Sequence, residues 1–459
     1  MKIETAILAA LAIILHSCTS PDKDFAVIFN GKDLEGWVVK NGSAPFTVQN
    51  GMIVGTCAAG TPNTFLCTEA TYGDFILTFE AKFGEGNSGV MFRAQSNPGY
   101  RDGRVHGYQM EMDPSARAWT GGIFDEARRK WLYPMEYNQE AKTAFRKGEW
   151  NQYRIEAIGN NLRTWVNGVQ MADLIDDVDA EGFIGLQVHS IGENSGLEGE
   201  EALFRNIRIC TSNLDRYRTP ENITIKQVSY LTNSLSEREQ EEGWKLLWDG
   251  ETTAGWRGAR LDHFPEKGWK IEDGVIKVEG ADGAESGNGG DIVTVEKYEN
   301  FILEVDFRIT RGANSGIKYF VDPGLNKGAG SAIGCEYQIL DDQLHPDAKM
   351  GKDGNRTLAS LYDLIPANAK RYNPDLREKR TNGYDWNRAM VVVQGDHVEH
   401  HLNGILVVQY NRSGQQWKDL VAGSKYAEWP DFGEARKGHL LLQDHGDEVH
   451  FRNIKLKIL

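Results

Sequence analysis

The sequence lacks a hydrophobic run long enough to cross a bilayer, since its apolar N-terminal stretch, Ala6 to Leu15, is too short to span one. It also lacks any run of Lys or Arg. With 51 basic and 66 acidic residues, its formal net charge is −15. This charge disfavours nucleic acid and anionic lipid as partners. Cysteine is scarce, at five residues, and no CxxC pair or Cys/His cluster has zinc-site spacing.

Motifs of several familiar chemistries are missing as well. The chain has no phosphate-binding P-loop, no Gly-x-Ser-x-Gly nucleophile elbow, no His-Glu-x-x-His zinc motif and no EF-hand loop. Cofactor-dependent redox chemistry therefore has no motif to support it. Frequent glycine, at 50 residues, and a 10% aromatic content are typical of an all-β protein with many tight turns. A neutral polar ligand such as a sugar is compatible with this composition.

The N-terminus is predicted to be a secretion signal over residues 1–17. It ends at Leu15-His16-Ser17-Cys18, which resembles a bacterial lipobox. The resemblance implies that Cys18 is diacylated, so that the protein is an exported outer-membrane lipoprotein whose only membrane contact is this anchor. An ordinary cleaved signal is the alternative. Residues 18–24 would form a tether, and its acidic residues resemble the export tags of Bacteroidota surface lipoproteins.

The rest of the chain contains the same ordered set of phrases twice, which indicates a duplicated domain. Polar residues kept in both copies are better site candidates than polar residues seen once. The repeated phrases are Asn87-Ser88-Gly89 and Asn314-Ser315-Gly316, Trp150-Asn151 and Trp386-Asn387, Asn167-Gly168 and Asn403-Gly404, Leu186-Gln187-x-His189 and Leu442-Gln443-x-His445, and Phe204-Arg205-Asn206-Ile207 and Phe451-Arg452-Asn453-Ile454.

Each copy shows the alternation of strands that are buried on one face. Apolar and polar residues alternate over 75–83 and over 301–309, and the repeated Asn-Gly pairs predict hairpin turns. The predicted fold class is therefore all-β, with two tandem β-sandwiches that resemble concanavalin A-like jelly rolls. We predict a first sandwich over 25–210, a linker over 211–243 with a short helix over 236–242, and a second sandwich over 244–459. Cys57 and Cys67 flank a predicted hairpin tip and could pair.

A polar strand pattern marks the candidate site in each copy. Glu336 and Gln338 share one strand face, and Asp341 joins them only through a bulge or at the strand end. In the first copy Gln109, Glu111 and Asp113 share a face without a bulge. A solvated sheet face would explain these patterns equally simply.

Other repeated polar residues extend the candidate set. Phe124-Asp125 and Tyr362-Asp363 suit either sugar binding or a turn capped by Asp. His189 and His445 follow the repeated Leu-Gln, and an imidazole has a pKa suited to proton abstraction near neutral pH. His401 shares a strand face with Glu399, while Lys318 has no counterpart in the first copy, where Met91 stands at its place and Arg93 lies two residues on.

Taken together, these segments resemble the 3-keto-disaccharide hydrolase domain, also described as a 3-keto-glucoside lyase/hydratase. The resemblance covers Phe29 to Ile209 and Trp244 to Leu459. The segments that carry it are NSGVMFR, GYQMEMD, GGIFDE and LQVH in the first copy, and NSGIKYF, GCEYQILDD, HPDAKMGKDGNRT, SLYDLIPA, HHLNG, LLQDHG and VHFRNIKL in the second.

The resemblance implies action on glycosides already oxidised at C3 by a partner dehydrogenase. A base removes the acidified C2 hydrogen, the C1 aglycone leaves, and water adds to the 3-keto-2-hydroxyglucal that remains. His445 or His401 is the candidate base and Glu336 a further catalytic residue, with a divalent metal ion as a potential electrophile. The second copy is expected to be the better-formed site. The residues assigned to substrate binding are Gln338, Asp341, Lys318, His345, Arg356, Tyr362, Asp363, Asp444, Gln443, Gln109, Glu111, Asp113, Arg93, Asp125 and His189.

Two other functions remain open at this point. The same sandwich serves non-catalytic carbohydrate-binding proteins, because fold alone does not determine activity. A conventional jelly-roll glycosidase is the second alternative, since Glu336-x-Gln338-x-x-Asp341 echoes its three-acid strand. The middle acid is replaced by Gln here, which counts against it.

Overall fold

The computed structural model describes residues 23–326, 328, 330–368, 385–429 and 431–459. The predicted signal peptide, the predicted lipidation site Cys18 and most of the tether lie outside these ranges. Among the described residues, no helix combines the length and the apolar character needed to cross a membrane.

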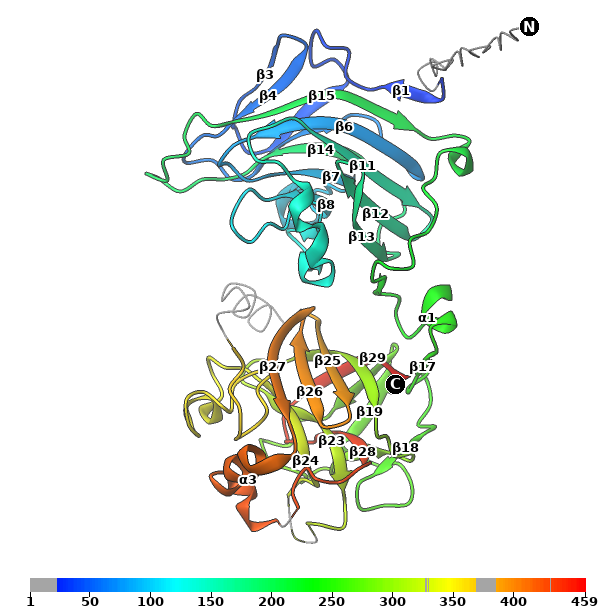
Figure 1. Cartoon of the computed structure of the whole chain (residues 1–459), viewed down its shortest axis with the longest axis vertical. Coiled ribbons are helices and arrows are strands. Elements are labelled where there is room, and N and C mark those ends of the chain that lie inside the picture. Colours follow the sequence, from blue (N-terminus) through cyan, green and yellow to red (C-terminus); the bar gives the residue numbers. More distant parts are fainter. Residues whose placement is uncertain (1–22, 327, 329, 369–384, 430) are drawn as a thin grey trace, which may run out of the picture.

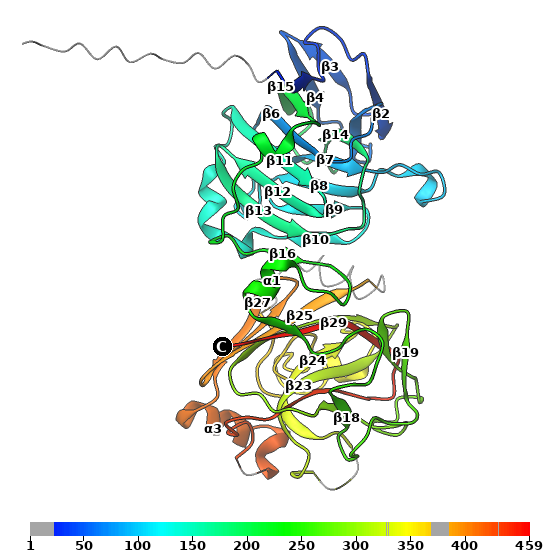
Figure 2. The same cartoon turned by 90° about the vertical axis from the view of Figure 1, so that its right-hand side faces the viewer.

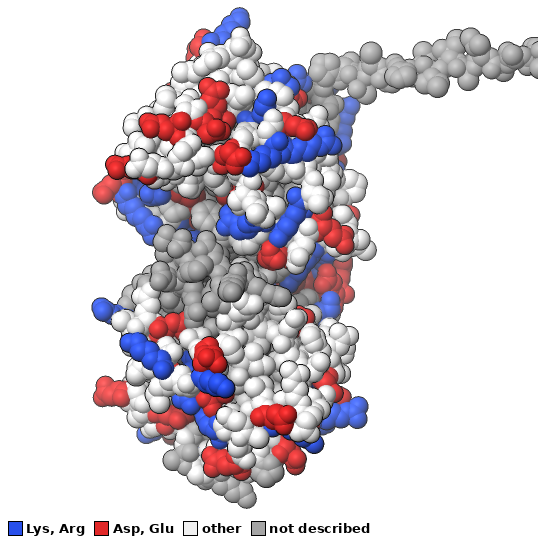
Figure 3. Space-filling view, turned by 60° about the vertical axis from the view of Figure 1, so that its left-hand side comes forward, with Lys and Arg blue, Asp and Glu red and all other residues white. Residues whose placement is uncertain are grey.

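Two β-sandwiches follow one another along the long axis of the molecule, joined by a segment that carries the short helix α1 (Glu237–Glu241) (Figures 1 and 2). The predicted all-β class with two tandem jelly-roll sandwiches is confirmed. Figure 3 shows acidic and basic side chains interspersed over one face of the molecule, without a continuous basic field.

Each sandwich has a back sheet and a front sheet. The first back sheet runs β16 (Val228–Ser229), β13 (Val169–Ile175), β12 (Asn161–Val166), β11 (Asn151–Ile158), β6 (Phe75–Phe83), β15 (Glu201–Cys210), β4 (Met52–Thr56), β3 (Phe46–Gln49), with β1 (Phe25–Val27) beside β15. The first front sheet runs β10 (Lys130–Tyr133), β9 (Ile123–Glu126), β8 (Gly107–Met112), β7 (Ser88–Ala94), β14 (Phe183–Val188), β5 (Thr64–Thr68), β2 (Trp37–Asn41).

The second sandwich repeats this plan with fewer strands. Its back sheet runs β19 (Trp269–Glu272), β20 (Val275–Val278), β29 (Val449–Ile458), β22 (Phe301–Ile309), β25 (Asn387–Gln394), β26 (His397–Leu402), β27 (Ile405–Asn411), with β17 (Trp244–Leu246) beside β29. Its front sheet runs β18 (Trp256–Gly258), β21 (Ile292–Thr294), β28 (His439–Leu442), β23 (Asn314–Asp322), β24 (Ile333–Leu340).

Short helical turns lie in the connections. They are η1 (Arg101–Gly103), η2 (Met135–Tyr137), η3 (Gln139–Ala144), η4 (Leu214–Arg216), η5 (Pro346–Lys349) and η6 (Lys425–Glu428), with the longer α3 (Gly414–Ala422) before the last of them.

Alternation places the core between the two sheets of each sandwich. In β6 the side chains of Phe75, Leu77 and Phe79 are buried, and those of Thr78 and Glu80 project outward. Each fully buried aromatic or aliphatic side chain contributes about 1.5–3 kcal/mol of transfer free energy. The predicted hairpin turns are also confirmed, because both Asn-Gly pairs have the positive φ angles of a type I′ turn.

The predicted linker helix is confirmed, and a capping box explains where it begins. The Ser236 hydroxyl accepts from the Glu239 amide, and the Glu239 carboxylate accepts from the Ser236 amide. Part of the linker also joins the first sandwich, because β16 pairs in parallel with β13.

The prediction that Cys57 and Cys67 flank a hairpin tip is wrong. The strands before and after the segment between them, β4 and β5, belong to opposite sheets, so the chain crosses from one sheet to the other. Both thiols are free and lie in separate buried clusters.

Candidate functional site

The polar residues of β24 project from the outer face of the second front sheet. Tyr337 points the other way, through the core, where its hydroxyl donates to the backbone oxygen of His401 at 3.1 Å. Strand alternation therefore directs Glu336 and Gln338 away from the back sheet. Both side chains are nonetheless buried, at 3% and 1% exposure, because loops cover this face.

The repeated Asn-Ser-Gly phrase shapes this face in both copies. A Cβ added to Gly316 would lie 2.2 Å from Glu336 Oε1, and one added to Gly89 would lie 2.5 Å from Gln109 Cδ. Glycine at these positions leaves room for the side chains of Glu336 and Gln109, on the neighbouring strands, to lie diagonally across it. The Ser315 hydroxyl donates to the Gln443 backbone oxygen at 2.8 Å and brings the repeated Leu-Gln phrase beside it.

Glu336 and Lys318 form a buried ion pair across strands β23 and β24. They are directly opposite in register, with Nζ 3.5 Å from Oε2. Burial raises the pKa of Glu336, and the positive charges of Lys318 and Lys425 oppose that rise. A buried pair of this kind is costly to break, because removing one partner leaves the other charged and desolvated.

A chain of amides leads from Gln338, two residues after Glu336 on the same strand face, to His445. Gln338 Nε2 donates to Asn314 Oδ1 at 3.3 Å, and the Asn314 amide contacts His445 Nε2 at 3.1 Å. Three buried atoms of this region have no hydrogen-bond partner among the described residues: Gln338 Oε1, Gln443 Oε1 and His445 Nδ1. Buried polar atoms without partners are expensive, so these three are positions at which a ligand would supply the missing bonds.

His345, His445 and Asp447 converge at the edge of the same face. Their ligand atoms lie within 4.8 Å of one another, and the two imidazole centroids are 5.9 Å apart. Burial lowers the pKa of His345 and keeps its imidazole neutral, while its Nδ1 accepts from the Asp347 amide at 3.2 Å. Two imidazoles and a carboxylate are a donor set that fits a divalent transition metal ion.

A charged rim borders this region. Arg356 pairs with Asp347 at 2.9 Å and with Asp363 at 2.6 Å, and the Tyr362 hydroxyl donates to Asp347 at 2.8 Å. The Lys425 ammonium lies 4.2 Å from the centroid of the Tyr362 ring. Arg356, Tyr362 and Asp363, predicted from the sequence as substrate-binding residues, therefore form one connected cluster.

Three predicted residues of the second copy lie outside this cluster. His401 projects from the outer face of the back sheet, on the opposite side of the sandwich from Glu336, and its Nε2 contacts Glu399 at 2.8 Å. The Asp341 carboxylate accepts from the backbone amides of Gly312, Gln343 and Leu344, as a turn cap does. The Asp444 carboxylate is fully buried and accepts from the Gly290 and Gly446 amides, so it supports the neighbouring loops.

The first copy exchanges the acid and the amide. Gln109 stands opposite Met91 as Glu336 stands opposite Lys318, and Glu111 stands opposite Gly89 as Gln338 stands opposite Gly316. The first copy therefore lacks the buried ion pair.

Amides surround the acid of the first copy. Its carboxylate accepts from Asn87 Nδ2 at 2.7 Å and from Gln109 Nε2 at 3.0 Å, and burial raises the pKa of Glu111 to about 7. Gln187 donates to Gln109 Oε1 at 3.0 Å, which closes the network.

The other candidates of the first copy hold loops or ion-pair networks together. Arg93 is 1% exposed and pairs with Asp74, while Asp113 pairs with Arg117 at 2.8 Å. The His189 Nδ1 donates to the Ser190 backbone oxygen at 2.7 Å.

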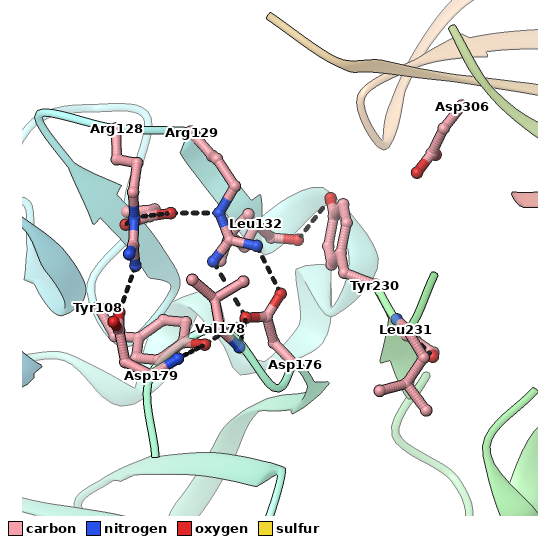
Figure 4. Close-up of polar contacts among 12 residues, drawn as sticks. Tyr108, Arg128, Arg129, Leu132, Asp176, Val178, Asp179, Tyr230, Leu231 and Asp306 are labelled. Carbon is pink, nitrogen blue, oxygen red and sulfur yellow. Dashed lines mark hydrogen bonds and ion pairs between the residues drawn. The ribbon is translucent and has the colours of Figure 1, made fainter. Parts of the chain in front are cut away.

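Asp125 belongs to a buried arginine network. It is fully buried and pairs with Arg128 at 2.9 Å and with Arg129. Figure 4 shows these two arginines turned toward Asp179 and Asp176, with ion-pair distances of 2.5 and 2.7 Å. This satisfied network leaves Asp125 without a free oxygen for a sugar.

Several residues of the second site were not predicted from the sequence. Asn314 had a signal, because it belongs to the repeated Asn-Ser-Gly phrase, and Asp347 lies in the HPDAK segment. Lys425 and Asp447 had no such sequence signal, because each lies in a loop and no local pattern predicts that these loops approach the sheet.

Comparison with known proteins finds a family that matches both domains. The family model of the 3-keto-alpha-glucoside-1,2-lyase-like domain matches residues 24–210 and again residues 243–457. A 3-keto-disaccharide hydrolase of Bacteroides thetaiotaomicron is 39% identical over 250 residues, which cover 50% of this chain and 82% of that protein.

Solved structures similar to this chain include two from Parabacteroides distasonis, both described as candidate glycosyl hydrolases. One is 32% identical with a TM-score of 0.42 and covers 50% of this chain and 99% of its own. The other is 24% identical with a TM-score of 0.33 and covers 47% of this chain and 99% of its own. Because the family model matches both sandwiches, the chain belongs to the 3-keto-alpha-glucoside-1,2-lyase-like domain family and contains two tandem copies of the domain.

Proposed function

We propose that the second domain cleaves glycosides that carry a ketone at C3, by eliminating the C1 aglycone, and hydrates the product. One observation carries the proposal. His445, with a buried and unpartnered Nδ1, interacts electrostatically with the buried Glu336 of the Glu336–Lys318 pair. It is also hydrogen-bonded through Asn314 to Gln338, which shares a strand face with Glu336. A base, an acid and a cation are the groups that this elimination needs.

In the proposed reaction, His445 removes the proton at C2 of the sugar, and the electron pair of the C–H bond forms the C2–C3 enolate. The enolate then expels the C1–O bond pair, and the leaving oxygen takes a proton. A 3-keto-2-hydroxyglucal remains, and addition of water across C1 and C2 gives the free 3-keto sugar. The net change is hydrolysis of the glycosidic bond.

The surroundings of each group suit its role. Rotating the Asn314 and Gln338 amides together by a half-turn would let the Asn314 oxygen accept from His445 Nε2 and the Gln338 oxygen accept from the Asn314 amide, which leaves the Nδ1 lone pair of His445 as the base. Burial raises the pKa of Glu336, which suits a carboxylic acid that donates to the leaving oxygen. Lys318 and Lys425 would stabilise the negative charge that develops at O3.

The cluster of His345, His445 and Asp447 offers an alternative source of electrophilic assistance. A divalent ion held there would act as a Lewis acid on the oxygens of the sugar, and it would occupy a nitrogen of His445. Loss of activity on adding a chelator would distinguish this metal-assisted arrangement from catalysis by the metal-free base.

The test uses the chain from Pro21 onward, which contains every described residue. It is incubated with a 3-keto-glucoside and with the unoxidised parent, each with and without EDTA. Release of aglycone from the keto form alone is expected. His445→Ala should lower kcat by about 100-fold or more, whereas His189→Ala, the matched change in the first copy, should leave it unchanged. Sugar binding without turnover of either substrate would refute the proposal in favour of a carbohydrate-binding protein, and cleavage of the unoxidised parent would point to a conventional glycosidase.

The proposed substrate is the product of an earlier oxidation. A glycoside 3-dehydrogenase must act first to create the ketone, so we propose that such an enzyme is the protein's functional partner.

We also propose that the chain is exported and anchored through Cys18. Metabolic labelling of the full-length protein with a fatty acid, lost in Cys18→Ala, tests the anchor.

A further inference from the structure

A polar pocket lies on the outer face of the back sheet of the first domain, apart from the candidate site described above. Its volume is about 700 Å³, and its wall includes Thr219 of the linker. Its floor is formed by outward-facing side chains of β6, β11, β12 and β15, among them Thr78, Glu80, Gln152, Arg154, Trp165 and Arg208. The pocket therefore faces away from the front sheet, on which the candidate residues Gln109 and Glu111 lie.

A row of cross-strand neighbours forms the centre of the floor. Arg154 and Arg208 both stand directly opposite Thr78, one on each side, and Trp165 stands opposite Arg154. Arg154 is neutralised by Glu156 at 2.7 Å, and Glu80 is paired with Arg205 at 2.7 Å. The Arg208 guanidinium has neither an ion pair nor a hydrogen bond with any residue that the structure describes.

The second domain shows what the same row does when it is covered. There Glu304 takes the place of Thr78 and Lys455 that of Arg208, and the two are directly opposite in register with their charges 3.7 Å apart. The linker covers this row, because Glu239 pairs with Lys455 and Lys226 lies 3.7 Å from Glu304.

The difference between the two rows is one of charge balance. In the covered row the acid Glu304 stands between Met390 and Lys455, so Lys455 has a counter-charge. In the open row the neutral Thr78 stands between Arg154 and Arg208, and Arg208 has no counter-charge beside it. A guanidinium in a concave site binds a carboxylate strongly, because it offers paired donors that match the two carboxylate oxygens.

We propose that this pocket of the first domain binds a carboxylate-bearing saccharide, with a uronate carboxyl on Arg208. The volume suits a ligand of one to a few sugar rings. The Thr78 hydroxyl and the Gln152 side chain, which make no side-chain hydrogen bond within the described ranges, would bind its hydroxyl groups. An acidic peptide is disfavoured because the site lies on a sheet face whose strands are already paired, so no strand edge is open to an extended chain.

The test is calorimetric titration of the chain from Pro21 onward with digalacturonate and, in parallel, with the neutral galactobiose. Digalacturonate should bind and galactobiose should bind at least about tenfold more weakly, because a charge-assisted hydrogen bond contributes more than that factor. Arg208→Ala should weaken digalacturonate binding by a similar factor. Thr78→Glu should do the same, because it supplies the acid that the second domain has at this position.

Lys82→Ala is the matched control, since Lys82 projects from the same face of β6 but does not line the pocket. It should leave binding unchanged, and Arg208→Ala should leave turnover of the 3-keto-glucoside unchanged. Equal binding of the two sugars, an equal loss in Lys82→Ala, or no binding of digalacturonate would overturn the proposal. Binding of an acidic dipeptide as tight as that of digalacturonate would show a general carboxylate site and refute the saccharide assignment.

Discussion

Glu111 offers the sharpest test of the reasoning about the two copies, because Gln338 occupies its place in the second domain. Its carboxylate is 5% exposed and accepts hydrogen bonds from Asn87 and Gln109. Burial nevertheless raises the pKa of Glu111 from the ordinary 4.5 to about 7, since these neutral donors do not offset the desolvation of the charge. Glu111→Gln removes the charge and imitates the other copy.

The size of the effect follows from the linkage between protonation and folding. A group whose pKa is higher in the folded state binds more protons there, so its contribution to stability is complete below pH 4.5 and is lost as the pH rises through about 7. Each pKa unit corresponds to about 1.4 kcal/mol, so ionised Glu111 costs the fold about 3 kcal/mol above pH 7. The amide accepts one hydrogen bond fewer, a loss of about 1 kcal/mol. The variant should therefore be about 2 kcal/mol more stable than the wild type at pH 8, and slightly less stable at pH 4.

The assay must report on the first domain, because the two sandwiches need not unfold together. Hydrogen exchange of the backbone amides of β8, measured at pH 6 and pH 8 and combined with urea unfolding at pH 4 and pH 8, gives a local free energy. Gln338→Glu is the reverse control and should destabilise the second domain at pH 8. A difference between Glu111→Gln and the wild type that is the same at pH 4 and pH 8 would refute the account of the buried charge.

The remaining predictions concern the second domain. Lys318→Met should destabilise it by about 3 kcal/mol, because Glu336 loses its partner. Adding Glu336→Gln recreates the Met91–Gln109 pair of the first copy and should recover most of this loss in urea unfolding. If the double variant recovers no stability, the ion-pair account is contradicted. Burial raises the pKa of Glu304, but the surrounding cations outweigh it and hold that pKa at about 2. The stabilisation by Glu304, about 3 kcal/mol, should therefore be present above pH 4.5 and lost as the pH falls toward 2, and a Glu304→Gln variant with the same acid dependence as the wild type would exclude it. Calorimetric titration with zinc should show one site that His345→Ala weakens by about tenfold or more, and unchanged binding would remove the metal assignment.

Local patterns in the sequence determined the elements and their duplication. Apolar alternation over 75–83 and over 301–309 predicted β6 and β22 to the residue, because a strand buried on one face requires a period of two. The Asn-Gly pairs predicted the hairpins, and Ser236 predicted the start of α1, because turns and caps depend on residues close together in the chain. The repeated phrases led to the two-domain organisation for the same reason.

Only the tertiary structure decided which polar residues meet. The alternation rule placed His401 with Glu399 correctly, yet it could not say which sheet β26 joins, and that sheet lies on the far side of the core from Glu336. Asp444 follows the repeated Leu-Gln as a site residue would, but its carboxylate accepts from backbone amides of a distant loop. Lys425 reaches the site from a turn after α3. These contacts join residues far apart in sequence, and their distances depend on the packing of sheets and loops, which no local period encodes.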